Sequence, residues 1–184
     1  MKDEPVILDD PGKLKALSHP LRRRILRRLS VHGPATSTTL GAVLGANTGT
    51  TSYHLRQLEK HGFIEEIPER SAGRERWWRR AGGPRDLRMP APDALAAADR
   101  HVLAETLRLA HAEDAELVSR LPESYAADPD WTLLSRGLTR MTEAGLREFF
   151  EDYLALLRRH GDRAAGDPDA RPVHVRLFTL PADD

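Results

Sequence analysis

Residues 48–62 combine side chains that can hydrogen-bond the edges of bases with side chains that can neutralise phosphates. Drawn as a helix at about 100° per residue, this stretch divides into two faces. A narrow packed stripe contains Thr51, Leu55, Leu58 and Gly62. The opposite face offers hydroxyls, a phenol, an amide and two cations without a carboxylate, on Thr50, Tyr53, Arg56, Gln57 and Lys60. Such a face has the chemistry needed to enter a groove of DNA.

Individual side chains of this face suit particular partners on DNA. Gln57 can pair with adenine through two hydrogen bonds, Arg56 can bind guanine or phosphate, and threonine methyl groups can touch thymine. Residues near the start of a recognition helix enter the groove most deeply. We therefore predict that double-stranded DNA is contacted by Thr48, Thr50, Thr51, Tyr53, His54, Arg56, Gln57 and Lys60. His54 lies at the edge of the packed stripe, so holding the contact between helices is its alternative role.

The elements that would position this face are further helices and a tight turn. The periodicity predicts helices over 11–17, 21–31 and 37–45, the turn 45–47 and a helix over 48–61. Pro20 suits the first position of the second helix, with Ser18 or His19 as its cap, and Thr36 or Ser37 would cap the third. Two short helices joined by a glycine-containing turn indicate a helix-turn-helix unit.

A β-hairpin is expected directly after this unit. Residues 63–67 and 76–79 are typical of strands, and the loop 68–74 between them has a basic tip. This wing would bring Arg70, Arg74 and Arg76 to the minor groove or to phosphates, with a merely solvated loop as the alternative. Two roles are open for Arg22, Arg23 and Arg27: contact with backbone phosphates, or plain exposure on the surface.

Three stretches of this region resemble the ArsR-like family of winged-helix repressors. Its opening signature resembles residues 16–26 (ALSHPLRRRIL), and its recognition helix resembles residues 51–64 (TSYHLRQLEKHGFI). Its wing and second strand resemble residues 73–78 (GRERWW). The resemblance covers residues 11–80. It implies a homodimer that reads a partly palindromic operator, with repression that an effector relieves.

The metal sites of that family do not carry over to this sequence. The helix before the recognition helix, residues 37–44, has no cysteine and therefore no ligand for a soft metal. A second metal site of the family is imitated by two groups of residues, which are Asp99 with His101, and His111 with Glu113 and Asp114. The gap between the histidines is one residue short, and one residue turns a helical side chain by about 100°. We expect these histidines to lie on a solvated face, and no metal or other cofactor to be bound.

The second half of the chain is expected to form a small, helix-rich α+β module. Its helices are predicted over 94–121 and 142–160. The alternation of 173–180 is typical of a strand, and 131–141 is read as its partner strand, although part of that segment keeps helical spacing. Dimerisation through 94–121 is one hypothesis for this module. An apolar effector pocket, in the module or at the dimer interface, is another.

Composition narrows the class of protein. The chain of 184 residues has no cysteine, no apolar signal region near Met1, and no apolar run approaching the ~20 residues of a membrane span. A cytoplasmic location is therefore expected. The formal net charge is zero, but residues 1–90 carry 17 Lys and Arg against 10 Asp and Glu, whereas the remainder carries 11 against 18. This asymmetry suggests that the first half approaches a polyanion.

Taken together, the sequence predicts an α+β protein with a winged helix-turn-helix domain over 11–80, a linker over 81–92 and a dimerisation or effector-binding module over 93–184. The predicted function is sequence-specific DNA binding by a dimeric repressor under the control of a small molecule. A winged helix that docks proteins without reading DNA is the alternative. We expect no enzyme activity, because the sequence has no glycine-rich phosphate loop and no nucleophile elbow.

Overall fold

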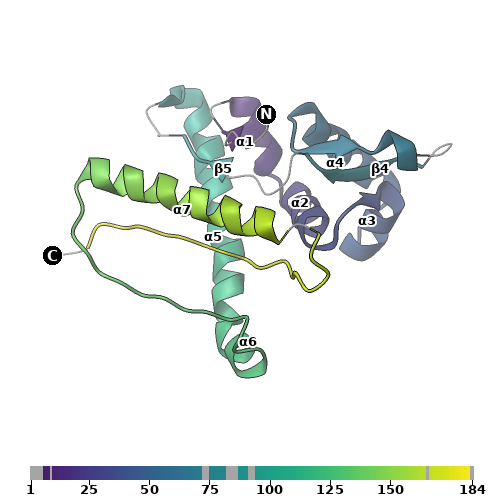
Figure 1. Ribbon diagram of the computed structural model, residues 1–184. Helices are drawn as coiled ribbons and strands as arrows, with labels where there is room; N and C mark the ends of the chain where they lie inside the picture. The colour runs from purple at the N-terminus through teal and green to yellow at the C-terminus, as the bar shows by residue number, and fades with distance from the viewer. Residues whose placement is uncertain are drawn as a thin grey trace. The chain divides into compact units, whose positions relative to one another are not determined.

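The computed structural model describes residues 6–8, 10–71, 75–81, 87–90, 94–164 and 166–182. The chain folds as two compact units, Met1–Arg140 and Met141–Asp184. The helices of the first unit are α1 (Pro11–Leu17), α2 (Pro20–His32), α3 (Ser37–Leu44), α4 (Thr48–Lys60), α5 (Arg100–Ser119) and α6 (Leu121–Ala127), with short 3-10 turns at Pro68–Arg70 and Ala97–Asp99. Its strands are β1 (Val6–Ile7), β2 (Ala35–Thr36), β3 (Ile64–Glu66), β4 (Trp77–Arg80) and β5 (Leu87–Arg88). Figure 1 shows these elements in chain order.

Polar side chains cap the starts of α2, α3 and α4, the first two at predicted residues. The Nδ1 atom of His19 accepts the N–H of Leu21 at 3.1 Å and caps α2. Thr36 caps α3 by accepting the N–H of Thr39 at 3.2 Å. Asn47 caps α4, with its side-chain oxygen 2.8 Å from the N–H of Thr50. Each cap pairs an N–H that a helix start leaves without an internal partner.

The tight turn of the helix-turn-helix depends on two glycines. Gly45 ends α3 with a φ of 67°, in the left-handed region that glycine enters without steric cost. Gly41 lies one turn earlier, where α4 and the turn approach α3 closely. A Cβ at this position would lie 2.7 Å from the carbonyl oxygen of Ala46 and 3.3 Å from Oγ1 of Thr51. The turn can therefore close only over a residue without a side chain.

Antiparallel pairing builds the wing into a three-stranded sheet of order β2-β4-β3. Ala35 pairs with Trp78 across β2 and β4, and Ile64 pairs with Arg80 across β3 and β4. The two hairpin strands confirm the expected wing, each with bounds shifted by about one residue. A separate two-stranded parallel ladder joins β1 to β5. The winged helix-turn-helix architecture predicted for the first half is confirmed.

One core runs from the helix-turn-helix into α5. Leu14, Ile25, Leu40, Leu55 and Leu58 are fully buried, and the same cluster includes Trp78, Leu95, Val102 and Leu103. The hydroxyl of Thr106 donates to the carbonyl of Val102 at 2.8 Å and lies 3.4 Å from that of Leu14 in α1. The first unit thus continues through α5. This division of the chain after Arg140 differs from the boundary expected at 81–92, a segment that is only partly within the described residues.

The second unit contains the helix α7 (Glu143–Arg163), whose first residue follows the capping hydroxyl of Thr142. This confirms the helix predicted over 142–160. The remaining described part of the unit, 166–182, has no regular secondary structure.

The two strands predicted in the second half of the chain are wrong. Residues 131–141 and 173–180 belong to no ladder among the described residues. A strand needs a neighbour that pairs its backbone and an apolar layer that covers one face. Neither segment pairs with a neighbouring strand among the described residues. No apolar layer covers them either, since Leu133, Leu138 and Leu180 remain 86–87% exposed. The predicted start of the preceding helix was also six residues early, because α5 begins at Arg100.

No helix within the described ranges is both long and apolar enough to cross a membrane.

Substituting Gly41 by Ala should destabilise the first unit by about 1–3 kcal/mol, because the new Cβ would overlap the backbone of the turn. Thermal unfolding followed by circular dichroism measures this effect. Gly49→Ala is the matched control in α4, where a Cβ would lie at an ordinary 3.4 Å from Oδ1 of Asn47. The control should leave stability unchanged or raise it by up to about 1 kcal/mol. Equal stability of the two variants would contradict the tight approach.

Candidate nucleic-acid interface

One face of α4 is open to solvent. Thr48, Tyr53, Arg56 and Lys60 are exposed, and Thr50 and Gln57 are half-buried. Arg56 and Lys60 form no ion pair with any residue that the structure describes. The opposite face, with Leu55 and Leu58 fully buried, packs into the core and fixes which side chains point outward.

Two residues predicted to contact DNA lie inside the domain instead. Thr51 is fully buried, and its hydroxyl donates to the carbonyl of Asn47 at 3.0 Å. His54 is 5% exposed and packs against His19, with 4.2 Å between ring centroids. Neither side chain is available to a ligand, so both are removed from the candidate interface. The polar type of each residue suggested contact with DNA, but their places on the packed side of the helix decide their role.

The wing presents its cations in different ways. Arg76 forms an ion pair with Glu66, with Nε 2.7 Å from Oε2, and its guanidinium lies 5.0 Å from the ring centroid of Trp78. This pairing lowers the pKa of Glu66 below its ordinary value. Arg70 is exposed, and its guanidinium lies 5.8 Å from the centroid of Trp77. Arg74 lies outside the described residues. Of the two predicted wing contacts that the structure describes, both are exposed, and Arg70 is the one that forms no ion pair with a described residue.

The comparisons with known proteins agree with this geometry. A protein-family model described as "Helix-turn-helix domain" matches residues 17–67, which run from the end of α1 through β3. The matched region, completed by β4, has the architecture of a winged helix-turn-helix domain, as the resemblance to the ArsR-like family implies. A helix-turn-helix places its second helix in the major groove of DNA. The domain therefore identifies the protein as a DNA-binding transcription regulator.

Two solved structures show lower similarity. One is an ArsR family transcriptional regulator, 25% identical, with a TM-score of 0.33 over 59% of this chain and 88% of its own. The other is a transcriptional regulator from Thermotoga maritima, 15% identical, with a TM-score of 0.32 over 81% of this chain and 80% of its own. TM-scores below 0.5 do not establish a shared fold over the aligned length. No curated protein matches the chain.

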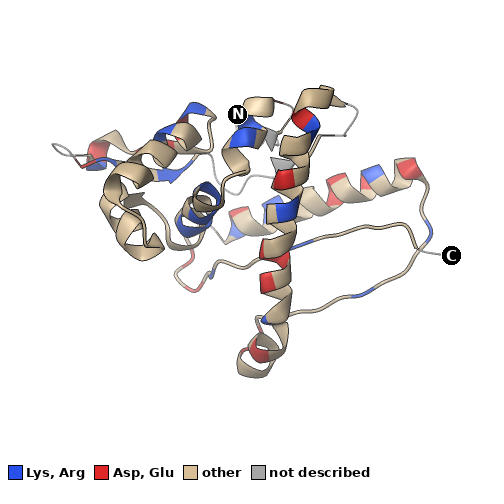
Figure 2. Cartoon of the chain, turned by 180° about the vertical axis from the view of Figure 1, so that it is seen from behind, with Lys and Arg blue, Asp and Glu red and all other residues tan. Residues whose placement is uncertain are grey.

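The arginines of α2 are held by the winged helix-turn-helix domain and by α5. Arg22 donates from Nε and Nη2 to the carbonyls of Ala16 and Lys15, the last acceptors of α1. Arg23 forms a two-pronged ion pair with Glu113, in which both N–O distances are 2.7 Å. Arg27 lies 3.7 Å from Glu116. Figure 2 shows the basic α2 and the acidic bands along α5. In this structure Arg22 and Arg23 are engaged within the fold, whereas a role for these arginines at phosphates stays untested.

Metal ligation has little geometric support. Within the described ranges, no three His, Asp or Glu side chains lie close enough together to hold a metal ion. Asp99 lies 3.7 Å from Nζ of Lys15, and His101 and His111 are exposed on α5. Asn47, which caps α4, also shapes the site and was not predicted. Its position directly before a threonine-rich helix start is the signal that could have identified it.

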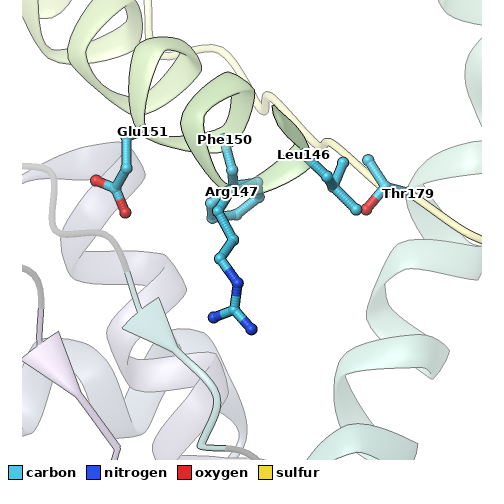
Figure 3. Close-up of a pocket in the computed structure, with 5 residues that line it drawn as sticks. All are labelled: Leu146, Arg147, Phe150, Glu151 and Thr179. Atoms are coloured by element: carbon cyan, nitrogen blue, oxygen red, sulfur yellow. The ribbon is translucent and has the colours of Figure 1, made fainter. Parts of the chain in front are cut away.

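A second candidate site is a solvent-open pocket in the second unit, with a volume of about 290 Å³. It is lined by Leu146, Arg147, Phe150 and Glu151 of α7 and by Thr179. Leu146 lies beside Thr179, and Arg147 extends away from them (Figure 3). Arg147 also forms an ion pair with Glu143 one turn earlier in α7. The pocket combines apolar walls with one cation at its edge.

The His19–His54 contact also joins the start of α2 to the recognition helix. Desolvation, and next the charge of Arg22, hold the pKa of His19 below its ordinary value. Desolvation, with His19 and Arg22 as further causes, also lowers the pKa of His54. The Nδ1 atom of His54 is buried without a hydrogen-bond partner among the described residues. Folding therefore favours the neutral form of both rings.

Acidification should destabilise this domain. A histidine whose pKa is lowered by folding binds a proton more readily in the unfolded chain. The stability that depends on the neutral rings is present above the ordinary histidine pKa of about 6.5, and it is lost as the pH falls through the lowered values. Urea unfolding between pH 7.5 and 5 measures this loss, because the two pH values lie about one unit above and about one and a half units below that pKa.

His54→Phe keeps a ring at the contact but removes one titrating group, so it should flatten the dependence of stability on pH. His101→Gln, which changes an exposed histidine of α5, is the control and should keep the dependence of the parent protein. A His54→Phe variant with an unchanged slope would show that the buried ring does not titrate in this range.

Proposed function

We propose that the protein is a sequence-specific, dimeric transcriptional repressor that reads operator DNA with the exposed face of α4 and responds to a small apolar effector. The observation that carries this proposal is the exposed face itself, where Arg56 and Lys60, which form no ion pair with a described residue, lie beside Gln57, Tyr53 and Thr50. Unpaired cations attract phosphates, and an amide beside them can read a base edge. This combination of cations and an amide favours DNA over a protein as the partner of the face.

In the proposed complex α4 lies in the major groove. Thr48 and Thr50 enter near the start of the helix, where contact with bases is deepest. Gln57 pairs with adenine, Arg56 takes guanine or a phosphate, and Lys60 neutralises a phosphate. Arg70 of the wing reaches an adjacent phosphate or the minor groove. Arg76 is assigned to holding the wing through Glu66 rather than to the DNA.

Dimerisation is assigned to the part of α5 and α6 that no core covers. Leu107, Val118 and Tyr125 are 46%, 56% and 55% exposed along this stretch. A second copy of the chain would cover them and would present two recognition helices to DNA. Helix-turn-helix dimers of this kind bind half-sites about 34–36 Å apart, which is one turn of DNA. Repression is the mode of action that the ArsR-like resemblance implies.

The effector is assigned to the pocket of the second unit. Its apolar walls, Leu146 and Phe150, suit a hydrocarbon surface, and Arg147 at the edge could accompany a polar end group. Pockets that bind small molecules usually have this mixture of apolar lining and few polar groups.

Selection of bound sequences from a random DNA library, at about 150 mM salt, tests the reading of DNA, because the salt concentration sets the non-specific background. We expect a partly palindromic motif. Gln57→Ala should relax the preference at one position of each half-site and cost about 1–3 kcal/mol of discrimination. Arg56→Ala should weaken binding, with a loss of base preference if the side chain reads guanine or a shallower salt dependence if it binds phosphate.

Arg100→Ala is the control for this experiment, since Arg100 is exposed at the start of α5, outside the part assigned to dimerisation. It should leave the motif unchanged. Light scattering of the same sample should give twice the chain mass of 20.6 kDa. Uniform or weak DNA binding would instead favour the alternative function, a winged helix that docks another protein.

Calorimetry with a panel of small apolar compounds tests the effector site. Leu146→Asp places a carboxylate on the apolar wall and should weaken binding of any hit by about tenfold or more. Leu156→Asp is the matched control, because Leu156 is exposed on the same helix and does not line the pocket. A hit that binds both variants equally would move the effector site elsewhere, and a panel without hits would leave the pocket without this role.

A further inference from the structure

The helix α5 is held to the winged helix-turn-helix domain in two different ways along its length. Its first two turns are part of the core, where Val102 and Leu103 are about 95% buried and Thr106 is fully buried. Beyond Thr106 no residue of α5 is buried. This second part spans 13 residues and about 20 Å of helix, and Figure 1 shows it continuing as a rod that ends in α6.

Charged contacts with α2 hold this outer part of α5, in which Leu109, Ala110 and Leu117 are only half-buried. Both prongs of the Arg23 guanidinium contact the carboxylate of Glu113 at 2.7 Å, with side-chain exposures of only 13% and 33%. Arg27 and Glu116 follow one turn further along both helices, at 3.7 Å and with greater exposure. A two-pronged arginine–carboxylate pair fixes the angle between its partners as well as the distance. The pair at Arg23 therefore constrains the direction in which the rod leaves the domain.

We infer that the Arg23–Glu113 pair is the positioning contact that sets the spacing of the two operator half-sites. This inference rests on the proposed function, in which the outer part of α5 and α6 forms the dimer interface. Because α2 packs directly against both α3 and α4, a change in the angle between α2 and α5 moves the recognition helix relative to the dimer axis. The two recognition helices of a dimer would then approach or separate together.

The Arg23–Glu113 pair affects the preferred separation of the half-sites and does not affect which bases are recognised within each half-site. Arg23 and Glu113 lie on α2 and α5, whereas the side chains assigned to base contact lie on α4. Loss of the pair should therefore change which separations of half-sites are tolerated, without changing the bases preferred within a half-site. A residue with a merely structural role would lower both together, because unfolded protein binds neither.

The experiment uses the full chain and a set of operators that carry the selected half-site as inverted repeats, with separations varied by single base pairs over one turn of DNA. The affinity ratio between the best separation and one displaced by half a turn measures spacing selectivity. In Arg23→Lys and Glu113→Gln this ratio should fall by about 3-fold to 10-fold, which is the range expected for a coupling contact between two elements. Affinity for a single half-site should stay within about twofold, a difference smaller than one ordinary hydrogen bond contributes.

Glu105→Gln is the matched control, because Glu105 pairs with Arg108 within α5 and forms no hydrogen bond or ion pair with α2 among the described residues. It removes a carboxylate from the same helix and should keep the selectivity of the parent protein. Selectivity that remains sharp in both Arg23→Lys and Glu113→Gln would overturn the inference. Absence of a half-site motif in the parent protein would overturn the proposed function itself, and this is seen before any variant is compared.

Discussion

The burial of one stripe of α4 determines what the remainder of the domain can present. Leu55 and Leu58 are fully buried together with Leu40 of α3, so the recognition helix cannot turn about its axis without exposing them. Burying a leucine side chain contributes about 1.5–3 kcal/mol, and a turn of the helix would remove several such contributions at once. The outward position of Gln57 and Arg56 is a consequence of this packing. Functional side chains need no fixed contacts of their own when the opposite face holds the helix.

Contacts within the fold also determine which positive charges remain available to DNA. The arginines of α2 could have competed with α4 for phosphates, but Arg22 binds the end of α1 and Arg23 binds Glu113. Their charges are used within the fold, where partial burial makes them more effective than exposed pairs. Among the described residues, Arg56 and Lys60 of α4 and Arg70 of the wing keep charges that no ion pair neutralises. Net charge alone does not reveal this division, because it counts paired and unpaired cations equally.

Local sequence was sufficient to predict the winged helix-turn-helix domain because each boundary is decided by neighbouring residues. His19 and Thr36 cap their helices through N–H groups two or three positions away, and Gly45 reverses the chain by its own backbone freedom. The exposed face of α4 followed from helical periodicity, although its contact with DNA remains a prediction. Thr51 was misplaced because the type of side chain was given more weight than its position on the packed side.

The contacts that sequence reasoning could not predict are those between distant residues. Ninety positions separate Arg23 from Glu113, and neither the helical period nor the composition relates them. The extended segments failed for a related reason. Alternation in 173–180 indicates that the segment is suited to a sheet, but it cannot supply the neighbouring strand that a sheet requires.

The exposed side chains of those segments have a consequence for the protein in solution. Leu133, Leu138, Phe178 and Leu180 are each more than 60% exposed, and the chain carries no formal net charge at pH 7, with an isoelectric point near 7.1. Colloidal stability depends on repulsion between molecules of like net charge, and this repulsion vanishes when the net charge is zero. Uncovered apolar side chains then favour association. The protein is therefore most prone to self-association in neutral buffers, and moderate alkalinity restores repulsion without protonating the buried histidines.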